Sequence, residues 1–265
     1  MKTNTVREKL RRGEVSVGTW LNLPDPTVAT VMTRVGFDWL TVELEHSPTT
    51  LVNATLSMSI IAGNGLVPLV RIASNTAENI KRALDCGAWG VVVPMVNSPE
   101  EAEAVVAAAR YAPIGERTIG GQLHAASFDT DSGTYYAQAN DQILVAVMAE
   151  HVKAIERADE ILRVPGIDLV FIGPNDLTHS MGIPPCFDTE DPRYVHALDH
   201  ILKTARKYGI ATGIHVADAA GARKRIEQGF QFIAVASDIG LMVSKSSEVT
   251  RDLGLGPARG PLVKY

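Results

Sequence analysis

Cysteine is scarce in this chain, and its scarcity limits the chemistry to be expected. Cys86 and Cys186 are the only two cysteines among 265 residues, and they lie in different parts of the sequence. Their spacing matches neither a cysteine metal site nor a C-x-x-C redox pair. We therefore expect buried or incidental thiols, which are consistent with a reducing compartment.

The chain also lacks an excess of basic residues and any long apolar segment. Its 25 Lys and Arg residues and 30 Asp and Glu residues give a formal net charge of −5, which offers no basic surface to nucleic acid. No segment reaches the ~18 apolar residues of a membrane-spanning helix. The charged stretch Met1–Glu14 has no apolar core, so we expect neither a signal peptide nor a membrane anchor. These features predict a cytoplasmic protein that acts on small molecules.

Hydrophobic residues make up 46% of the chain, enough for a large core, and they gather in eight short runs. Most runs are continuous Val, Ile and Leu rather than alternating, as is typical of parallel strands buried on both faces. The runs are Val15–Trp20, Trp39–Glu43, Val67–Arg71, Gly90–Pro94, Leu144–Met148, Leu169–Ile172, Ala211–His215 and Phe232–Ala236. Because helix-like segments separate them, the sequence predicts an α/β fold, a (β/α)8 TIM barrel, in a single domain spanning 1–265.

Several of the intervening helices have recognisable boundaries. Proline or hydroxyl-bearing residues precede the predicted helices Thr27–Val35, Ala77–Cys86 and Ala102–Arg110. Glycines follow helices and precede strands at Gly36, Gly87, Gly209 and Gly229, where a left-handed cap is needed. Two stretches are irregular: the connection Ala112–Asn140, whose length indicates a functional loop or an oligomer contact, and the tail Gly254–Tyr265.

Chemically versatile residues lie at or just after the ends of these strands. In a barrel of this type the catalytic groups gather at the carboxyl ends of the strands. Those ends carry Glu43, Glu45, His46, Arg71, Glu150, Asp176, His215 and Asp238. The sequence therefore predicts an acidic pocket that contains one arginine.

Glu150 and Asp176 follow two consecutive strands, so their carboxylates can converge. Two carboxylates completed by substrate and water oxygens suit a hard cation such as Mg²⁺ or Mn²⁺. The alternative is that each residue only caps the helix that follows it, and spacing alone does not separate the two interpretations.

His46 and Arg71 complete the set of candidate catalytic residues. A histidine near carboxylates at the barrel mouth suits general acid–base catalysis, although a solvated histidine without a role is the alternative. Arg71 ends a rigid strand and could stabilise an enolate, or it could form only a structural salt bridge. Together with a metal pair, these residues indicate a reaction that passes through the enolate of a 2-oxo acid.

The same segments resemble the HpcH/HpaI family of class II, metal-dependent pyruvate aldolases, from about Gly18 to Met242. Family-like phrases occur in family order: Gly36–Leu40 with Glu45–Pro48, Leu69–Arg71, Lys81–Gly87 with Val93–Val96, Arg110–Pro113 and Phe171–Leu177. The resemblance implies a barrel of the phosphoenolpyruvate/pyruvate type. It also implies a homohexamer, a dimer of trimers, in which the carboxyl-terminal helix, here Gly240–Leu253, is exchanged between subunits.

The resemblance also assigns roles to individual positions. His46 matches the acid or base that usually acts through water, and Asp85 matches the aspartate that raises its basicity. Arg71 matches the arginine that stabilises the enolate oxygen. Glu150 and Asp176 match the metal ligands, and the backbone around Gly173, Pro174 and Asn175 matches the part that receives the pyruvate carboxylate.

The chain departs from the family pattern at a few positions near the expected site. Met148 replaces a glutamine that could donate a hydrogen bond to substrate, and Glu43-Leu44 replaces an aspartate-glycine pair. Gln122 and His124 lie in the long connection and are candidates to replace the missing contact, although a loop histidine without a role is the alternative. These changes bear on the substrate more than on the enolate chemistry.

The leading hypothesis is an aldolase that uses one divalent ion, Mg²⁺, Mn²⁺ or Co²⁺, and no organic cofactor. It would cleave a 4-hydroxy-2-oxo acid reversibly to pyruvate and an aldehyde through a metal-bound enolate, without a lysine Schiff base. A second hypothesis is an oxaloacetate decarboxylase, or an enzyme like macrophomate synthase, that uses the same enolate. A third is a protein that binds a metal and a 2-oxo acid without turnover.

Overall fold

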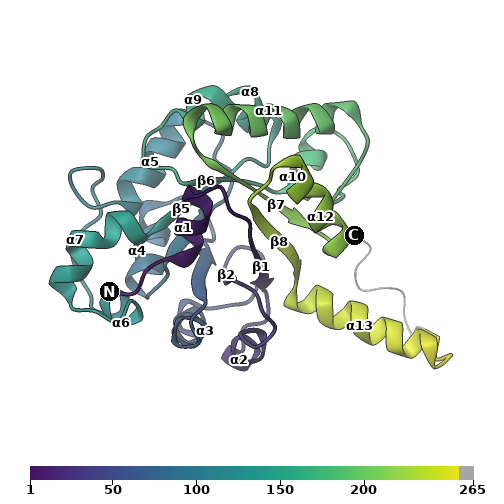
Figure 1. Cartoon of the computed structure of the whole chain (residues 1–265), viewed down its shortest axis with the longest axis horizontal. Coiled ribbons are helices and arrows are strands. Elements are labelled where there is room, and N and C mark those ends of the chain that lie inside the picture. Colours follow the sequence, from purple (N-terminus) through teal and green to yellow (C-terminus); the bar gives the residue numbers. More distant parts are fainter. Residues whose placement is uncertain (257–265) are drawn as a thin grey trace.

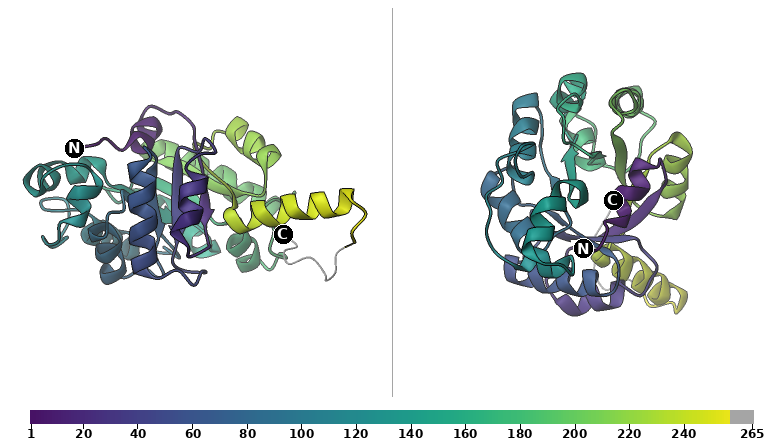
Figure 2. Two further views of the ribbon diagram at one scale, coloured as in Figure 1. Left: turned by 90° about the horizontal axis from the view of Figure 1, so that it is seen from below. Right: turned by 60° about the vertical axis from the view of Figure 1, so that its left-hand side comes forward.

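Eight parallel strands close into a barrel in the computed structural model, which describes residues 1–256. Each strand pairs with the next along the chain, and the last pairs with the first (Figures 1 and 2). The strands are β1 (Ser16–Leu21), β2 (Trp39–Glu43), β3 (Val67–Arg71), β4 (Gly90–Val93), β5 (Leu144–Met148), β6 (Leu169–Ile172), β7 (Ala211–Val216) and β8 (Phe232–Ser237). The predicted barrel is confirmed, and no predicted strand end is wrong by more than one residue.

Helices surround the barrel, in keeping with the continuous apolar strands. They are α1 (Thr5–Arg11), α2 (Pro26–Met32), α3 (Leu51–Gly63), α4 (Ala77–Asp85), α5 (Pro99–Ala109), α6 (Leu123–Ser127), α7 (Ser132–Gln142), α8 (Val152–Glu156), α9 (Ala158–Leu162), α10 (Pro174–Ser180), α11 (Pro192–Tyr208), α12 (Ala219–Gln228) and α13 (Asp238–Asp252). The predicted glycine stops are confirmed in backbone geometry. Gly209 and Gly229, for example, end α11 and α12 with φ of 68° and 102°, which a residue with a Cβ rarely adopts.

Two segments are more ordered than the sequence predicts. The charged amino terminus forms α1, because Val6 and Leu10 lie one turn apart and both are buried. The connection 112–140 contains α6 and most of α7, and α6 packs against α3 and α4. Its glycine and serine content suggested an irregular loop, but the side chains of His124 and Tyr135 bury these helices against the barrel.

Interior glycines show which side chains point into the barrel. A Cβ on Gly18 would lie 2.1 Å from the Trp39 ring, and a Cβ on Gly213 would lie 2.9 Å from the Phe171 ring. These glycines therefore make room for large interior side chains. Because side chains alternate along a strand, residues two positions further on also face the interior, near the carboxyl-terminal mouth. Trp20 and His215 are such residues.

The helix α13 extends away from the barrel (Figures 1 and 2). Asp238, its first residue, is its only buried one and accepts hydrogen bonds from the backbone N–H groups of Asn22 and Leu23, at 2.9 and 3.0 Å. This strand-end acid is thus a structural link between α13 and β1. The helix confirms the one expected over Gly240–Leu253, whereas most of the predicted irregular tail lies outside the described residues.

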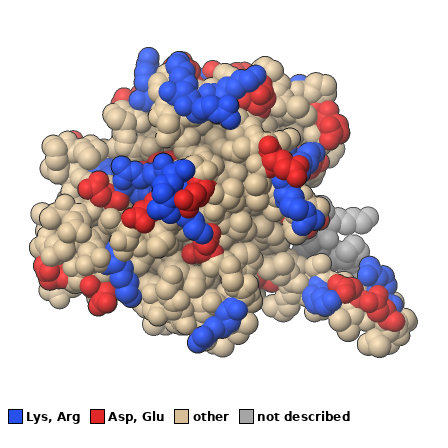
Figure 3. Space-filling model, viewed as in Figure 1, with Lys and Arg blue, Asp and Glu red and all other residues tan. Residues whose placement is uncertain are grey.

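The described surface agrees with the charge balance of the sequence. On the face shown in Figure 3, basic and acidic side chains lie close together over much of the surface and leave large uncharged areas between them. No helix within residues 1–256 is long and apolar enough to cross a membrane.

Candidate active site at the barrel mouth

Glu43 organises the mouth of the barrel from the end of β2. Its side chain is 1% exposed. One carboxylate oxygen accepts hydrogen bonds from the backbone N–H groups of Glu45 and His46, at 2.6 and 3.0 Å, and the other lies 2.5 Å from Arg71 Nε. The buried carboxylate therefore fixes both the loop that carries His46 and the guanidinium of Arg71. Sequence reasoning named Glu43 only as a possible substrate contact, whereas its bonds assign it a positioning role.

Arg71 is held on three sides at the end of β3. Besides Glu43, it lies 3.5 Å from a Glu45 carboxylate oxygen, and its Cζ lies 4.9 Å from the centre of the Trp20 ring. The hydrogen bond to Glu43 uses Nε, and neither Nη atom makes a hydrogen bond among the described residues. The salt-bridge interpretation is therefore correct as far as it goes, but two donors remain available to a ligand.

Glu150 is an almost fully buried carboxylate, 3% exposed, just beyond β5. One of its oxygens accepts a hydrogen bond from the Met95 backbone N–H at 2.8 Å. Met95 has a φ of 54°, a strained value for a non-glycine residue, which such sites often retain for function. Burial raises the pKa of Glu150 to about 7, and the negative charges of Asp176 and Glu45 add to that effect.

The helix-capping interpretation of Glu150 and Asp176 is wrong. The side chain of His151, not Glu150, caps α8 by accepting a hydrogen bond from the Lys153 N–H at 3.2 Å. Asp176 lies inside the first turn of α10, which begins without a side-chain cap. Neither carboxylate is therefore used to end a helix, and both are available to a ligand.

The residues at the mouth fit a hard divalent cation. Glu45, Glu150 and Asp176 lie close enough for their charges to interact, and burial also raises the pKa of Glu45. Glu150 has one carboxylate oxygen without a hydrogen bond among the described residues. Within 1–256 no group of three or more His, Cys, Asp and Glu side chains is arranged around one metal position. Two carboxylates with room for water and substrate oxygens are typical of Mg²⁺ or Mn²⁺ sites.

Gly173 is required next to Glu150. A Cβ at this position would lie 2.6 Å from a Glu150 carboxylate oxygen and 3.2 Å from the Met148 methyl group. The following residues, Pro174 and Asn175, begin α10, and the backbone N–H groups of Asn175 and Asp176 have no partner within the helix. This stretch can accept a small anionic group close to Glu150.

We expect Gly173→Ala to reduce turnover by at least about a hundredfold, since the methyl group must displace the Glu150 carboxylate and misplacements of about 1 Å have effects of this size. Steady-state kinetics and circular dichroism would measure activity and folding. Gly63→Ala is the matched control, because a Cβ at the exposed end of α3 meets nothing within 4 Å. Full activity of the Gly173 variant would show that Glu150 does not need its observed position.

His46 reaches the mouth but lies mainly in solvent. Its side chain is 64% exposed, and Nε2 lies 3.8 Å from a Glu45 carboxylate oxygen. Asp85, expected to support it, ends α4, which starts at the mouth and runs back to the opposite end of the barrel. There Asp85 accepts a hydrogen bond from Arg117 at 2.7 Å. Within one chain Asp85 therefore does not assist His46.

Gln122 and His124 lie at that same far end, against α4 and α7. His124 is buried, its ring centre lies 4.3 Å from that of Tyr135, and neither ring nitrogen is hydrogen-bonded among the described residues. Burial, reinforced by Arg117, lowers the pKa of His124. The expectation that one of these residues compensates for Met148 is therefore wrong within a single chain, because Met148 ends β5 at the mouth.

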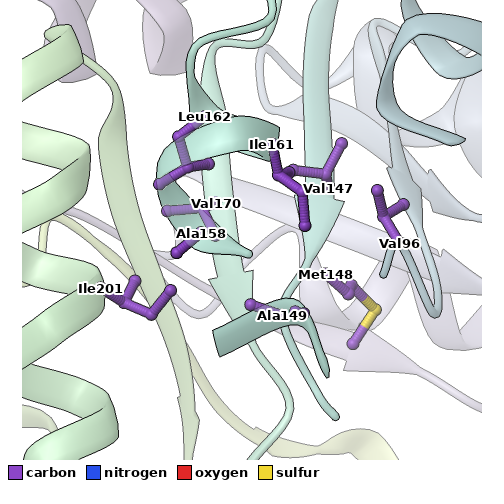
Figure 4. A pocket seen from close by; sticks show the side chains of 10 residues that line it. Val96, Val147, Met148, Ala149, Ala158, Ile161, Leu162, Val170 and Ile201 are labelled. Carbon is purple, nitrogen blue, oxygen red and sulfur yellow. The ribbon is translucent and has the colours of Figure 1, made fainter. Parts of the chain in front are cut away.

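Met148 places a buried apolar side chain beside Glu150. It also borders a small void between the barrel and α8 and α9, shown in Figure 4, whose lining is entirely apolar. Val147, Ala149 and Val170 line this void from the outer faces of their strands, so it is separate from the mouth. Sequence reasoning missed Met95 and Trp20, since nothing in the sequence reveals a backbone N–H aimed at Glu150 or a ring beneath Arg71.

Comparisons with known proteins agree with this geometry. The family model "HpcH/HpaI aldolase/citrate lyase" matches residues 16–244. A hydroxypyruvate/pyruvate aldolase of Roseovarius nubinhibens is 36% identical over 248 residues, 94% of this chain and 95% of that protein. A 2-keto-3-deoxy-L-rhamnonate aldolase of Klebsiella pneumoniae is 36% identical over 236 residues, 89% of this chain and 88% of that protein. The crystal structure of an HpcH/HpaI aldolase from Desulfitobacterium hafniense superimposes with a TM-score of 0.87 at 31% identity, covering 96% of this chain and 98% of that one.

Proposed function

Because this chain belongs to the HpcH/HpaI aldolase/citrate lyase family and is a carbon–carbon lyase, we propose that it cleaves a 4-hydroxy-2-oxo acid reversibly to pyruvate and an aldehyde. The observation that carries this proposal is one arginine, Arg71, with free Nη donors among the carboxylates of Glu45, Glu150 and Asp176. Such a site can hold a 2-oxo acid and stabilise the charge that develops on its oxygen.

We propose Glu150 and Asp176 as the ligands of one divalent ion, Mg²⁺, Mn²⁺ or Co²⁺, with no organic cofactor. When bound, the ion polarises the 2-oxo group and offsets negative charge on the enolate oxygen. The excess of carboxylates at the mouth and the raised pKa of Glu150 support the assignment, since a buried carboxylate is stabilised by a nearby cation.

Four groups of the chain have roles in the cleavage. The backbone from Gly173 to Asn175 receives the substrate carboxylate, and the Nη donors of Arg71 bind the 2-oxo oxygen. His46, acting through a water molecule, removes the proton from the C4 hydroxyl. The C3–C4 bond then breaks, the C4 oxygen becomes the aldehyde carbonyl, and the bonding electrons pass to the enolate, which is protonated at C3.

Asp85 can support His46 only from a second copy of the chain. Asp85 lies at the amino-terminal end of one barrel and His46 at the carboxyl-terminal mouth, so the two ends must meet between subunits. We therefore retain Asp85 as a residue that raises the basicity of His46 across a subunit contact. We also propose a cytoplasmic location, in keeping with the two free cysteines.

The proposal is tested by following pyruvate consumption with a panel of small aldehydes. Activity should vanish in EDTA and return with Mg²⁺, Mn²⁺ or Co²⁺, and Asp176→Asn should not respond to the added ion. A borohydride-trapped pyruvate adduct without inhibition by EDTA would rule out the mechanism. Metal-dependent loss of oxaloacetate without any aldol adduct would instead assign a decarboxylase, and tight binding of pyruvate without either product would assign a binding protein.

We propose that α13 docks on a neighbouring subunit in a homohexamer. The helix carries exposed apolar side chains, including Met242 (55% exposed) and Val249 (47% exposed), on a segment that its own barrel leaves uncovered. Val31 and Val35, on and just after α2, are also exposed. An apolar helix face and an apolar barrel surface of this kind are complementary between copies of one chain.

The double variant Met242→Asp, Val249→Asp is expected to dissociate the assembly, because each buried charge would lose its hydration on docking. Light scattering after size-exclusion chromatography would measure the mass of the particle. Ser247→Asp, on the opposite side of α13, adds a charge without touching that face and is expected to leave the mass unchanged. A variant with the wild-type mass would exclude this face of α13 from the subunit contacts.

A further inference from the structure

His215 faces the mouth of the barrel but has no part in the proposed cleavage. It lies near the end of β7, and the pairing of Ile214 with Ile172 places His215 level with Gly173 on the neighbouring strand. Its side chain points to the interior because it lies two residues beyond Gly213, whose Cβ would collide with interior rings. His215 is therefore next to the stretch that is proposed to receive the substrate carboxylate.

One hydrogen bond determines which ring nitrogen of His215 carries the proton. Nε2 lies 2.9 Å from the carbonyl oxygen of Ala236, and a carbonyl can only accept, so Nε2 is the donor. Burial lowers the pKa of His215 to about 4, and Arg71 adds to the effect, so the ring is neutral near pH 7. Nδ1 then has a lone pair, is left accessible, and makes no hydrogen bond among the described residues.

The surroundings of His215 favour a neutral ligand group. Its ring centre lies 5.9 Å from that of Trp20 and 4.9 Å from that of Phe187, so apolar walls flank it. A neutral imidazole acceptor repels the lone pairs of a carboxylate and satisfies the O–H of an alcohol. Trp20 also lies beneath Arg71, which places this acceptor beside the proposed reacting oxygens.

We propose that Nδ1 of His215 accepts a hydrogen bond from a hydroxyl group of the substrate, so that the enzyme favours hydroxylated substrates. This inference rests on the proposed function and specifies its substrate class. The hydroxyl can belong to the 2-oxo acid, as in hydroxypyruvate, or to the aldehyde, as in glycolaldehyde. In both cases the donor is an alcohol and the acceptor is the same nitrogen.

Two matched pairs of substrates test the inference and identify the source of the hydroxyl. Hydroxypyruvate is compared with pyruvate using one aldehyde, and glycolaldehyde is compared with acetaldehyde using pyruvate. For each pair the ratio of kcat/KM, hydroxylated over plain, is measured in wild type, His215→Leu and His215→Gln. We expect the ratio to fall about tenfold in His215→Leu for one pair, the effect of one lost hydrogen bond.

The variants separate recognition from a merely structural role. Leucine also removes the bond to Ala236, but a loosened strand would slow both members of a pair and leave their ratio unchanged. Glutamine can donate to Ala236 through its amide nitrogen and accept through its oxygen, so we expect it to restore most of the ratio. His196→Leu, an exposed histidine on α11, is the matched control and should not move either ratio.

Failure of this inference is distinguishable from failure of the proposed function. Wild-type turnover with both ratios unmoved in His215→Leu would overturn the inference alone. Absence of metal-dependent product from every pair would overturn the proposed function. The inference is then judged by nitrogen NMR of His215: a larger shift of Nδ1 with the hydroxylated member of a pair would support it, and equal shifts would overturn it.

Discussion

Glu150→Gln is expected to lower turnover by at least about a thousandfold and to abolish stimulation by added metal. Glutamine keeps an oxygen for the Met95 N–H but removes the negative charge that we assign to ion binding. Kinetics with and without Mn²⁺, together with calorimetric titration of Mn²⁺, would measure both losses. Glu248→Gln on α13 is a suitable control, since this half-exposed carboxylate lies far from the mouth. Substantial metal-dependent activity in Glu150→Gln would exclude Glu150 as a ligand.

The same substitution is expected to stabilise the metal-free protein at high pH. The pKa of Glu150 rises from 4.5 to about 7 on folding, so the folded state holds its proton more tightly than the unfolded state. Wild type therefore loses stability as the pH rises from about 4.5 to 7, by a total of about 3 kcal/mol, whereas glutamine does not titrate. Urea unfolding in EDTA should show nearly equal stability at pH 4.5 and a more stable variant at pH 8. Parallel pH dependences would contradict the raised pKa.

Arg71→Ala is expected to lower turnover about a thousandfold, since it removes the donors assigned to the enolate oxygen. It should also destabilise the fold by about 3 kcal/mol, because it leaves the Glu43 carboxylate buried without its cation. Kinetics and urea unfolding would measure the two effects separately.

A double variant separates the two consequences of losing Arg71. In Arg71→Met, Glu43→Gln no charge remains unpaired, and the glutamine oxygen still accepts from the Glu45 and His46 N–H groups. Most of the lost stability should therefore return while turnover stays low. A double variant as unstable as Arg71→Ala would show that Arg71 stabilises the fold by packing on Trp20 rather than by pairing with Glu43.

The barrel could be predicted from sequence because its strands are buried on both faces. That burial requires continuous apolar runs, and the ends of those runs identify the mouth, as Glu43, Arg71 and Glu150 illustrate. The amino-terminal helix was missed because only two of its residues, Val6 and Leu10, are buried. A short helix with so few apolar residues gives no clear periodic pattern.

The finer geometry of the site could not be predicted from residue types. The acceptors of Glu43 and the left-handed backbone of Met95 depend on coordinates that no sequence pattern specifies. Asp85 and His124 were expected near the mouth, yet a residue at the end of an outer helix lies at the opposite end of the barrel. Sequence spacing places residues along the chain, whereas the direction of each helix decides which end of the barrel they reach.

The projecting α13 makes the helical content of this protein depend on its concentration. A helix of 15 residues anchored only by its first turn is marginal in water, so its later turns are stabilised mainly by docking on another copy. Mass action then couples docking to helix formation. Dilution should reduce the far-ultraviolet circular dichroism per residue before the barrel itself unfolds, and the thermal midpoint should rise with protein concentration.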